Sequence, residues 1–141
     1  MSPCGVGQRR EVGYGSRRDG TGIGVIVAKY IISFGAHAMD HIPDEDMAAV
    51  AEAAHAVVEE IINAGAFVLA GAVDEGTSSV VAVDGAISVG SEPREISGLT
   101  VIDVATREEA LAWATKIAVA CRCAQEVRAI MPDPQLEEML H

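Results

Sequence analysis

The fold is decided by residues Gly98 to Met131, which read GLTVIDVATREEALAWATKIAVACRCAQEVRAIM. Leu99 to Val104 is a short apolar run rich in β-branched residues, which predicts a strand. Thr106 stands three residues before Glu109, which is the capping-box spacing that satisfies two backbone N–H groups at a helix start. We therefore expect a helix to open here and to lead into a second strand, Gln125 to Met131, which a proline ends.

The chain upstream shows the same order of elements. Val25 to Phe34, VIVAKYIISF, predicts a strand. A helix is expected from Pro43, whose following acidic residues suit the positive end of a helix dipole, to Asn63. Gly65 suits the left-handed cap after that helix, and Ala66 to Val73 predicts the next strand.

A β-hairpin is expected between these two units. Val80 to Val83 and Ala86 to Val89 flank Asp84-Gly85, and this dipeptide accepts the positive φ values of a two-residue type I′ turn. Residues 134–140, PQLEEML, predict one short helix at the C-terminal end.

The element order predicts an α+β fold, a ferredoxin-like βαββαβ sandwich with both helices on one face of an antiparallel sheet and the hairpin as an insertion. However, Ile31-Ile32, Val68-Leu69 and Val101-Ile102 are apolar at consecutive positions, so both faces of the sheet need cover. Exposed apolar area forgoes about 25 cal/mol per Å². We therefore expect a homodimer in which the sheet faces meet, a dimeric α+β barrel.

The length of 141 residues predicts one compact domain, at residues 25–131. The first 24 residues hold seven of the fourteen glycines without helical or strand periodicity, which predicts a flexible tail. Residues 132–141 are a short C-terminal extension.

Charge and composition exclude several partners. The net charge is −11 although residues 1–24 carry four arginines, so the acidic body should repel nucleic acid. No apolar run approaches the roughly 20 residues needed to cross a membrane. The odd cysteine count, Cys4, Cys121 and Cys123, without a secretory signal peptide predicts a reducing cytoplasm.

His55 is the first candidate catalytic residue. It lies at the flank of the apolar helix stripe beside Ala51 and Val58, so its ring should enter a partly buried space between helix and sheet. Histidine changes charge nearest neutral pH and can act as a general base or acid. The alternative is a boundary histidine that hydrogen-bonds a backbone carbonyl.

A second cluster precedes the same helix, where His37, Asp40 and His41 share a loop. Asp40 could orient His41 or His55 for catalysis. The alternative is a solvated loop, because these spacings match no known metal site. No metal is therefore expected.

Arg94, in the loop GSEPREIS, is the best cation for a carboxylate or phenolate substrate. The alternative is an arginine that pairs with Glu92 or Glu95. The chain has no phosphate loop, no nucleophile elbow and no Cys-x-x-Cys, so no cofactor is expected. Cys121-Arg122-Cys123 is interpreted as two idle or buried thiols.

Several segments together resemble the YCII-related proteins, especially the branch with an Asp-Gly-Pro-Phe signature. They are Ala28-Lys29-Tyr30-Ile31-Ile32, Ile61-Ile62-Asn63-Ala64-Gly65-Ala66, Gly98-Leu99-Thr100-Val101-Ile102-Asp103-Val104, Arg107-Glu108-Glu109-Ala110-Leu111-Ala112-Trp113-Ala114 and Glu126-Val127-Arg128. The resemblance covers roughly residues 25–131 and implies a dimeric α+β barrel. It also implies dechlorinating or lyase-like chemistry with a histidine and an acidic partner, as in a few relatives.

The chain departs from that family at two places. Ala86-Ile87-Ser88-Val89 stands where the branch carries its signature, and Ile117-Ala118 stands near the Asp-Pro of other relatives. The acid of the family therefore has no counterpart there, whereas His55 lies within about one position of the family's histidine.

Two functions follow from these patterns. The first is a cofactor-free dimeric enzyme that transfers protons on a small metabolite, as a lyase, an isomerase or a dechlorinating enzyme, with His55 as base and Arg94 as anion holder. The second is a non-catalytic module that binds a small molecule or serves as an accessory protein.

Overall fold

The structure is a computed structural model that describes residues 15–18, 24–74, 76, 78–90 and 96–140. It is a mixed α+β fold with an open antiparallel sheet. The elements in chain order are β1 (Gly15–Arg18), β2 (Gly24–Phe34), the 3₁₀ turn η1 (Asp44–Asp46), α1 (Met47–Asn63), β3 (Phe67–Ala72), β4 (Ser79–Val81), β5 (Ile87–Val89), β6 (Gly98–Val104), α2 (Arg107–Cys121), β7 (Glu126–Ala129) and α3 (Pro134–Met139).

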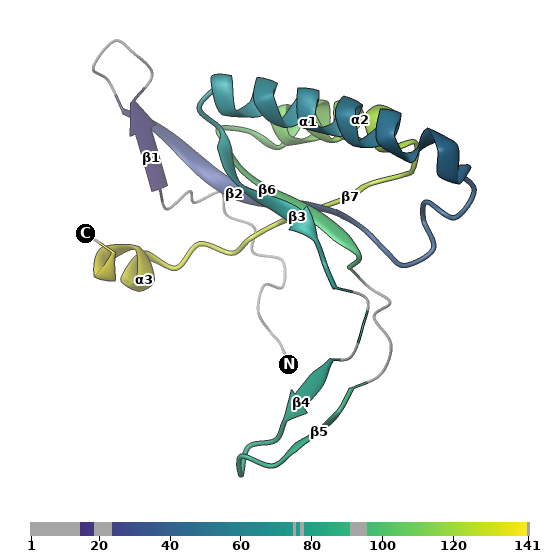
Figure 1. Cartoon of the computed structure of the whole chain (residues 1–141). Coiled ribbons are helices and arrows are strands. Elements are labelled where there is room, and N and C mark those ends of the chain that lie inside the picture. The colour runs from purple at the N-terminus through teal and green to yellow at the C-terminus, as the bar shows by residue number, and fades with distance from the viewer. Residues whose placement is uncertain (1–14, 19–23, 75, 77, 91–95, 141) are drawn as a thin grey trace.

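The main sheet runs in the order β7-β2-β6-β3, and every neighbouring pair is antiparallel. α1 connects β2 to β3, and α2 connects β6 to β7. Both helices lie over the same face of the sheet, as Figure 1 shows. The predicted α+β class and antiparallel sheet are confirmed. No helix in the described part of the chain is long and apolar enough to cross a bilayer.

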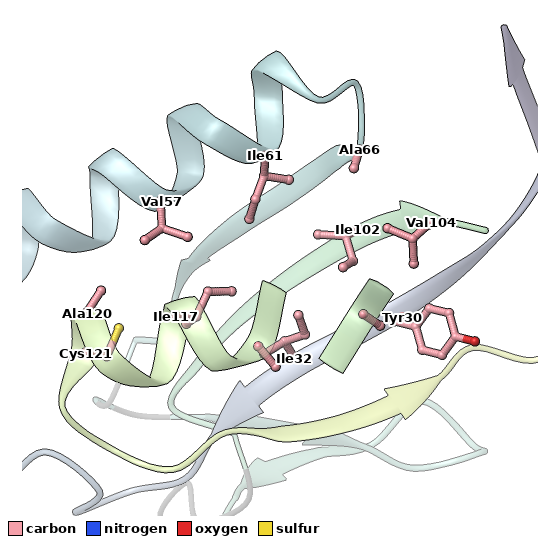
Figure 2. Packing of buried hydrophobic residues seen from close by; sticks show 12 residues of the cluster. Tyr30, Ile32, Val57, Ile61, Ala66, Ile102, Val104, Ile117, Ala120 and Cys121 are labelled. Atoms are coloured by element: carbon pink, nitrogen blue, oxygen red, sulfur yellow. The ribbon is translucent and has the colours of Figure 1, made fainter. Parts of the chain in front are cut away.

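The hydrophobic core fills the layer between the two helices and the sheet. Val57 and Ile61 reach down from α1, and Ile117 points into the same layer from α2 (Figure 2). Ile32 and Ile102 meet them from the two central strands and are fully buried. Because aliphatic side chains supply nearly all of this core, it depends on close packing of small groups rather than on aromatic rings.

The start of α2 follows the predicted capping box. Glu109 N donates to Thr106 Oγ1 at 3.1 Å, and Ala105 N donates to Glu109 Oε1 at 3.0 Å. The reciprocal bond therefore reaches Ala105, one residue before the cap. At the end of α1, Gly65 has φ +75°, which confirms the predicted left-handed cap.

Two ion pairs join α2 to the region of α1. Lys116 Nζ lies 2.9 Å from Glu60 Oε1, and Arg122 Nη1 lies 3.0 Å from Asp46 Oδ2. All four side chains are largely exposed, so each pair contributes at most about 1 kcal/mol. The pairs link the two helices, which run antiparallel.

The structure differs from the expectations in two segments. Gly15–Arg18, inside the segment expected to be a flexible tail, forms β1 and pairs with residues 24–27 of β2. The remaining tail residues, 1–14 and 19–23, lie outside the described residues.

The predicted type I′ turn is also wrong. The strands pair Val81 with Ile87, and Gly85 N donates to Ala82 O at 2.9 Å. Gly85 has φ +91°, whereas Asp84 keeps a negative φ. The connection is therefore a three-residue loop with one left-handed glycine. Asp84 Oδ1 also accepts from Ala86 N at 2.9 Å, which holds this form.

The sheet face away from the helices is partly apolar. The register places Ile31, Val101 and Leu69 in one row across β2, β6 and β3. Val101 is buried, but Leu69 is 49% exposed. On the same face Lys29 Nζ lies 3.3 Å from Asp103 Oδ1. The face therefore combines an apolar row with a charged flank.

β4 and β5 form a separate two-stranded sheet that projects from the body, as Figure 1 shows. We call residues 79–89 the hairpin arm. Its large apolar side chains are exposed on both faces, Val89 to 78%. An isolated two-stranded hairpin is only marginally stable in water, so the pairing of β4 with β5 stabilises the arm only weakly.

Candidate functional site

A cavity of about 390 Å³ opens where α1 and α2 pass over the ends of β3 and β6. The space exists because β3 carries small residues there, Ala70, Gly71 and Ala72, and Ala72 stands opposite Gly98 in β6. Side chains of this size cannot fill the gap between the sheet and the helices. We call this space the main cavity.

The walls of the main cavity are mostly apolar. α1 contributes Ala54 and Val58, α2 contributes Ile117, and Phe34 and Phe67 add two aromatic rings from the sheet. No Lys, Arg, Asp or Glu lines it within the described part of the chain. A concave, largely apolar site with few polar groups is typical of small-molecule binding.

His55 is the one candidate of the sequence analysis that the structure places at the main cavity. It sits on α1 and is exposed. Among the described residues, no carboxylate hydrogen-bonds its ring. The predicted pairing of an acid with His55 is therefore not seen within those residues.

Asp40 and His41 lie in the exposed turn between β2 and η1, and neither lines the main cavity. Asp40 Oδ2 lies 2.7 Å from Nδ1 of His37, so Asp40 orients His37 rather than His41 or His55. His37 adopts φ +70°, which is uncommon for a residue other than glycine. Arg94 lies outside the described residues.

Sequence reasoning missed the polar groups that line the main cavity. Thr100, in β6, is only 8% exposed and lines the main cavity. Gln125, just before β7, also lines the cavity. The one available signal was a threonine inside the otherwise apolar run of β6.

A second cavity of about 300 Å³ adjoins the first. Phe34 and Gln125 line both cavities and therefore stand between them. The second cavity is more polar, because Ser33 and Glu126 line it. Glu126 Oε2 is paired with Arg128 Nη2 at 2.9 Å.

The thiol of Cys121 also lines the main cavity, at the end of α2 (Figure 2). Burial raises the pKa of Cys121, and the nearby Cys123 raises it further. Burial raises the pKa of Cys123 as well, while a hydrogen bond from Gln125 lowers it. Both thiols therefore stay neutral at physiological pH, and a neutral thiol is a poor nucleophile.

Metal ligands do not gather in the described residues, since no three His, Cys, Asp or Glu side chains come together there. In comparisons with known proteins, no model of a protein family and no curated protein matched the chain. The geometry of the two cavities is therefore the main indication of function.

Proposed function

We propose that this chain is a small-molecule-binding protein whose ligand occupies the main cavity. The observation that carries the proposal is the cavity itself, about 390 Å³ with mostly apolar walls. Burial of a compact apolar ligand there would contribute about 25 cal/mol per Å² of apolar surface removed from water. The resemblance to YCII-related proteins agrees with a small-molecule site.

A binding role is favoured over catalysis by the surroundings of His55. Catalytic histidines are usually oriented by a carboxylate or a carbonyl group. Asp40, the acid expected to orient it, bonds to His37 instead. Cys121 is kept neutral by burial, which disfavours a thiolate nucleophile.

The binding test uses a substitution that fills part of the main cavity. Ala70 shares the helix-facing side of the sheet with Thr100, so Ala70→Leu should narrow the cavity. Naphthalene binding, followed by NMR titration, should weaken at least tenfold in this variant. Ala53→Leu, at an exposed position of α1 away from the cavity, is the matched control. Equal naphthalene affinity in all three proteins would refute the proposal.

Proton-transfer catalysis on a small metabolite is the second candidate, with His55 as base and Arg94 as anion holder. One observation favours it, the position of His55 on the cavity wall. His55→Ala and His55→Gln should then abolish turnover without changing the melting temperature. Unchanged turnover in both variants would remove this candidate.

We further propose that two copies pair through the open sheet face, as in a dimeric α+β barrel built from ferredoxin-like subunits. The row Ile31, Val101 and Leu69 supports this, because Leu69 is 49% exposed and a partner would remove its side chain from water. Leu69→Asp should shift sedimentation to the monomer, whereas Leu111→Asp on exposed α2 should not. A wild-type monomer at micromolar concentration would contradict the pairing.

A reducing cytoplasm suits the free thiols of Cys121 and Cys123.

A further inference from the structure

The walls of the main cavity are mostly apolar and carry only a few polar side chains. The described walls carry no Lys, Arg, Asp or Glu, and Cys121 is a neutral thiol. A charged ligand group would lose hydration there, and only His55 could offer it a charge in return. Apart from His55, the described walls therefore select against ions.

The position of Thr100 marks where a ligand would place its polar atom. Its side chain lies on the helix-facing side of β6, two residues before the fully buried Ile102. Thr100 is only 8% exposed and lines the main cavity. A hydroxyl group can both donate and accept a hydrogen bond, so a ligand oxygen in the cavity would have a partner there.

Gln125 supplies a complementary group on the wall of the main cavity. Its described hydrogen bonds use only the amide nitrogen, which donates to Cys123 O at 3.4 Å and contacts Cys123 Sγ at 3.5 Å. The amide oxygen remains able to accept. The cavity therefore offers the polar group of a ligand a side chain that can donate, Thr100, and a side chain that can accept, Gln125.

The aromatic walls indicate the shape of the ligand. Phe34 and Phe67 line the main cavity on the sheet side, and flat apolar rings pack favourably against such side chains. We infer that the ligand is an uncharged ring compound with one hydroxyl or keto group, and that Thr100 is the residue that selects it. This inference depends on the proposed binding function of the main cavity.

The test uses three naphthalenes of the same shape, namely 2-naphthol, naphthalene and 2-naphthoate. Wild-type protein should bind 2-naphthol more tightly than naphthalene and at least tenfold more tightly than 2-naphthoate. Thr100→Val keeps the shape of the side chain and removes its hydroxyl. It should weaken 2-naphthol binding about three- to tenfold and leave naphthalene binding within twofold.

Thr115→Val is the matched control, because this exposed threonine on α2 bonds only to Leu111 O in its own helix. It should leave the affinities for all three probes unchanged. Thr100→Ser keeps the hydroxyl and should keep the preference for 2-naphthol. If Thr100→Val does not fold, Gln125→Met provides the second test. This substitution removes the accepting group and should lower the preference for 2-naphthol over naphthalene.

The outcomes separate this inference from the binding function. Unchanged 2-naphthol affinity in Thr100→Val or, should that variant not fold, in Gln125→Met overturns the inference alone, as does tighter wild-type binding of 2-naphthoate than of 2-naphthol. In those cases naphthalene binding that Ala70→Leu weakens would still support the cavity as a ligand site. A wild-type protein that binds none of the three probes overturns both.

Discussion

Phe34 and Gly98 face each other across β2 and β6, and the ring of Phe34 occupies the space that a side chain on Gly98 would fill. An added Cβ would lie 2.6 Å from Cε2 of the ring, closer than real contacts allow. Aromatic rings that cover a glycine on a neighbouring strand stabilise sheets. Here the same ring also forms part of the wall between the two cavities.

Gly98→Ala should displace the Phe34 ring from its position. We expect the free energy of unfolding to fall by about 1–3 kcal/mol, as for other overpacked sites. In a Phe34→Ala background the same substitution should cost much less, because the clash is gone. Urea denaturation of the two single variants and the double variant measures this coupling. Additive effects would show that the ring and the glycine are independent.

The capping box of α2 should be cooperative. Thr106→Ala and Glu109→Ala each remove one of the two bonds at the helix start, and each should lower the free energy of unfolding by about 1 kcal/mol. The double variant should cost less than the sum, since each bond holds the other partner in place. Glu108→Ala is the charge-matched control and should cost less than either.

Arg122 carries backbone strain at the end of α2. Its φ is +57°, in the left-handed region that glycine adopts freely. Arg122→Gly should therefore be more stable than Arg122→Ala by about 1 kcal/mol. Both variants lose the ion pair with Asp46 equally, so the comparison isolates the backbone. Equal unfolding midpoints in urea would contradict the strain.

The stability of the fold should depend on pH through Cys121. Its pKa is raised above the ordinary 9.0 in the folded protein, mainly by burial. Between the unfolded and folded pKa values the unfolded chain loses the proton first, so rising pH favours unfolding. The contribution is complete below about pH 9 and is lost as pH rises through the folded pKa.

We therefore expect the free energy of unfolding to fall more steeply above pH 9 in the wild type than in Cys121→Ala. Urea denaturation between pH 8 and pH 10.5 measures the two slopes. Other groups that titrate in this range contribute to both proteins and cancel in the difference. Parallel slopes would mean that the thiol is not desolvated.

Elements with local signals were predictable from the sequence. The Thr106 and Glu109 spacing identified the start of α2, and Gly65 identified the end of α1, because caps depend on a few adjacent residues. Strands β2 and β6 were predictable because each is a continuous apolar run in the sequence. β1 was missed because Gly15–Arg18 pairs through its backbone with β2 and has no apolar pattern of its own.

The site was less predictable, because a cavity is made by what several distant segments leave empty. Ala70, Gly71 and Ala72 were interpreted simply as a strand, and nothing local shows that α1 and α2 leave a space above them. Thr100 was passed over for the same reason. His55 was found because its position on the helix could be counted from the sequence. The bond of Asp40 to His37 could not be predicted, because it depends on the geometry of a turn.

The hairpin arm has a consequence for how its two strands align. Elsewhere in the sheet, a slip of one residue would turn buried side chains such as Ile32 toward water, and the core would resist it. In the arm both faces already meet water, so no such resistance exists. The alignment of Val81 with Ile87 is thus fixed by the loop around Gly85 alone. Substitutions in that loop can therefore shift the register between β4 and β5 while the rest of the molecule stays unchanged.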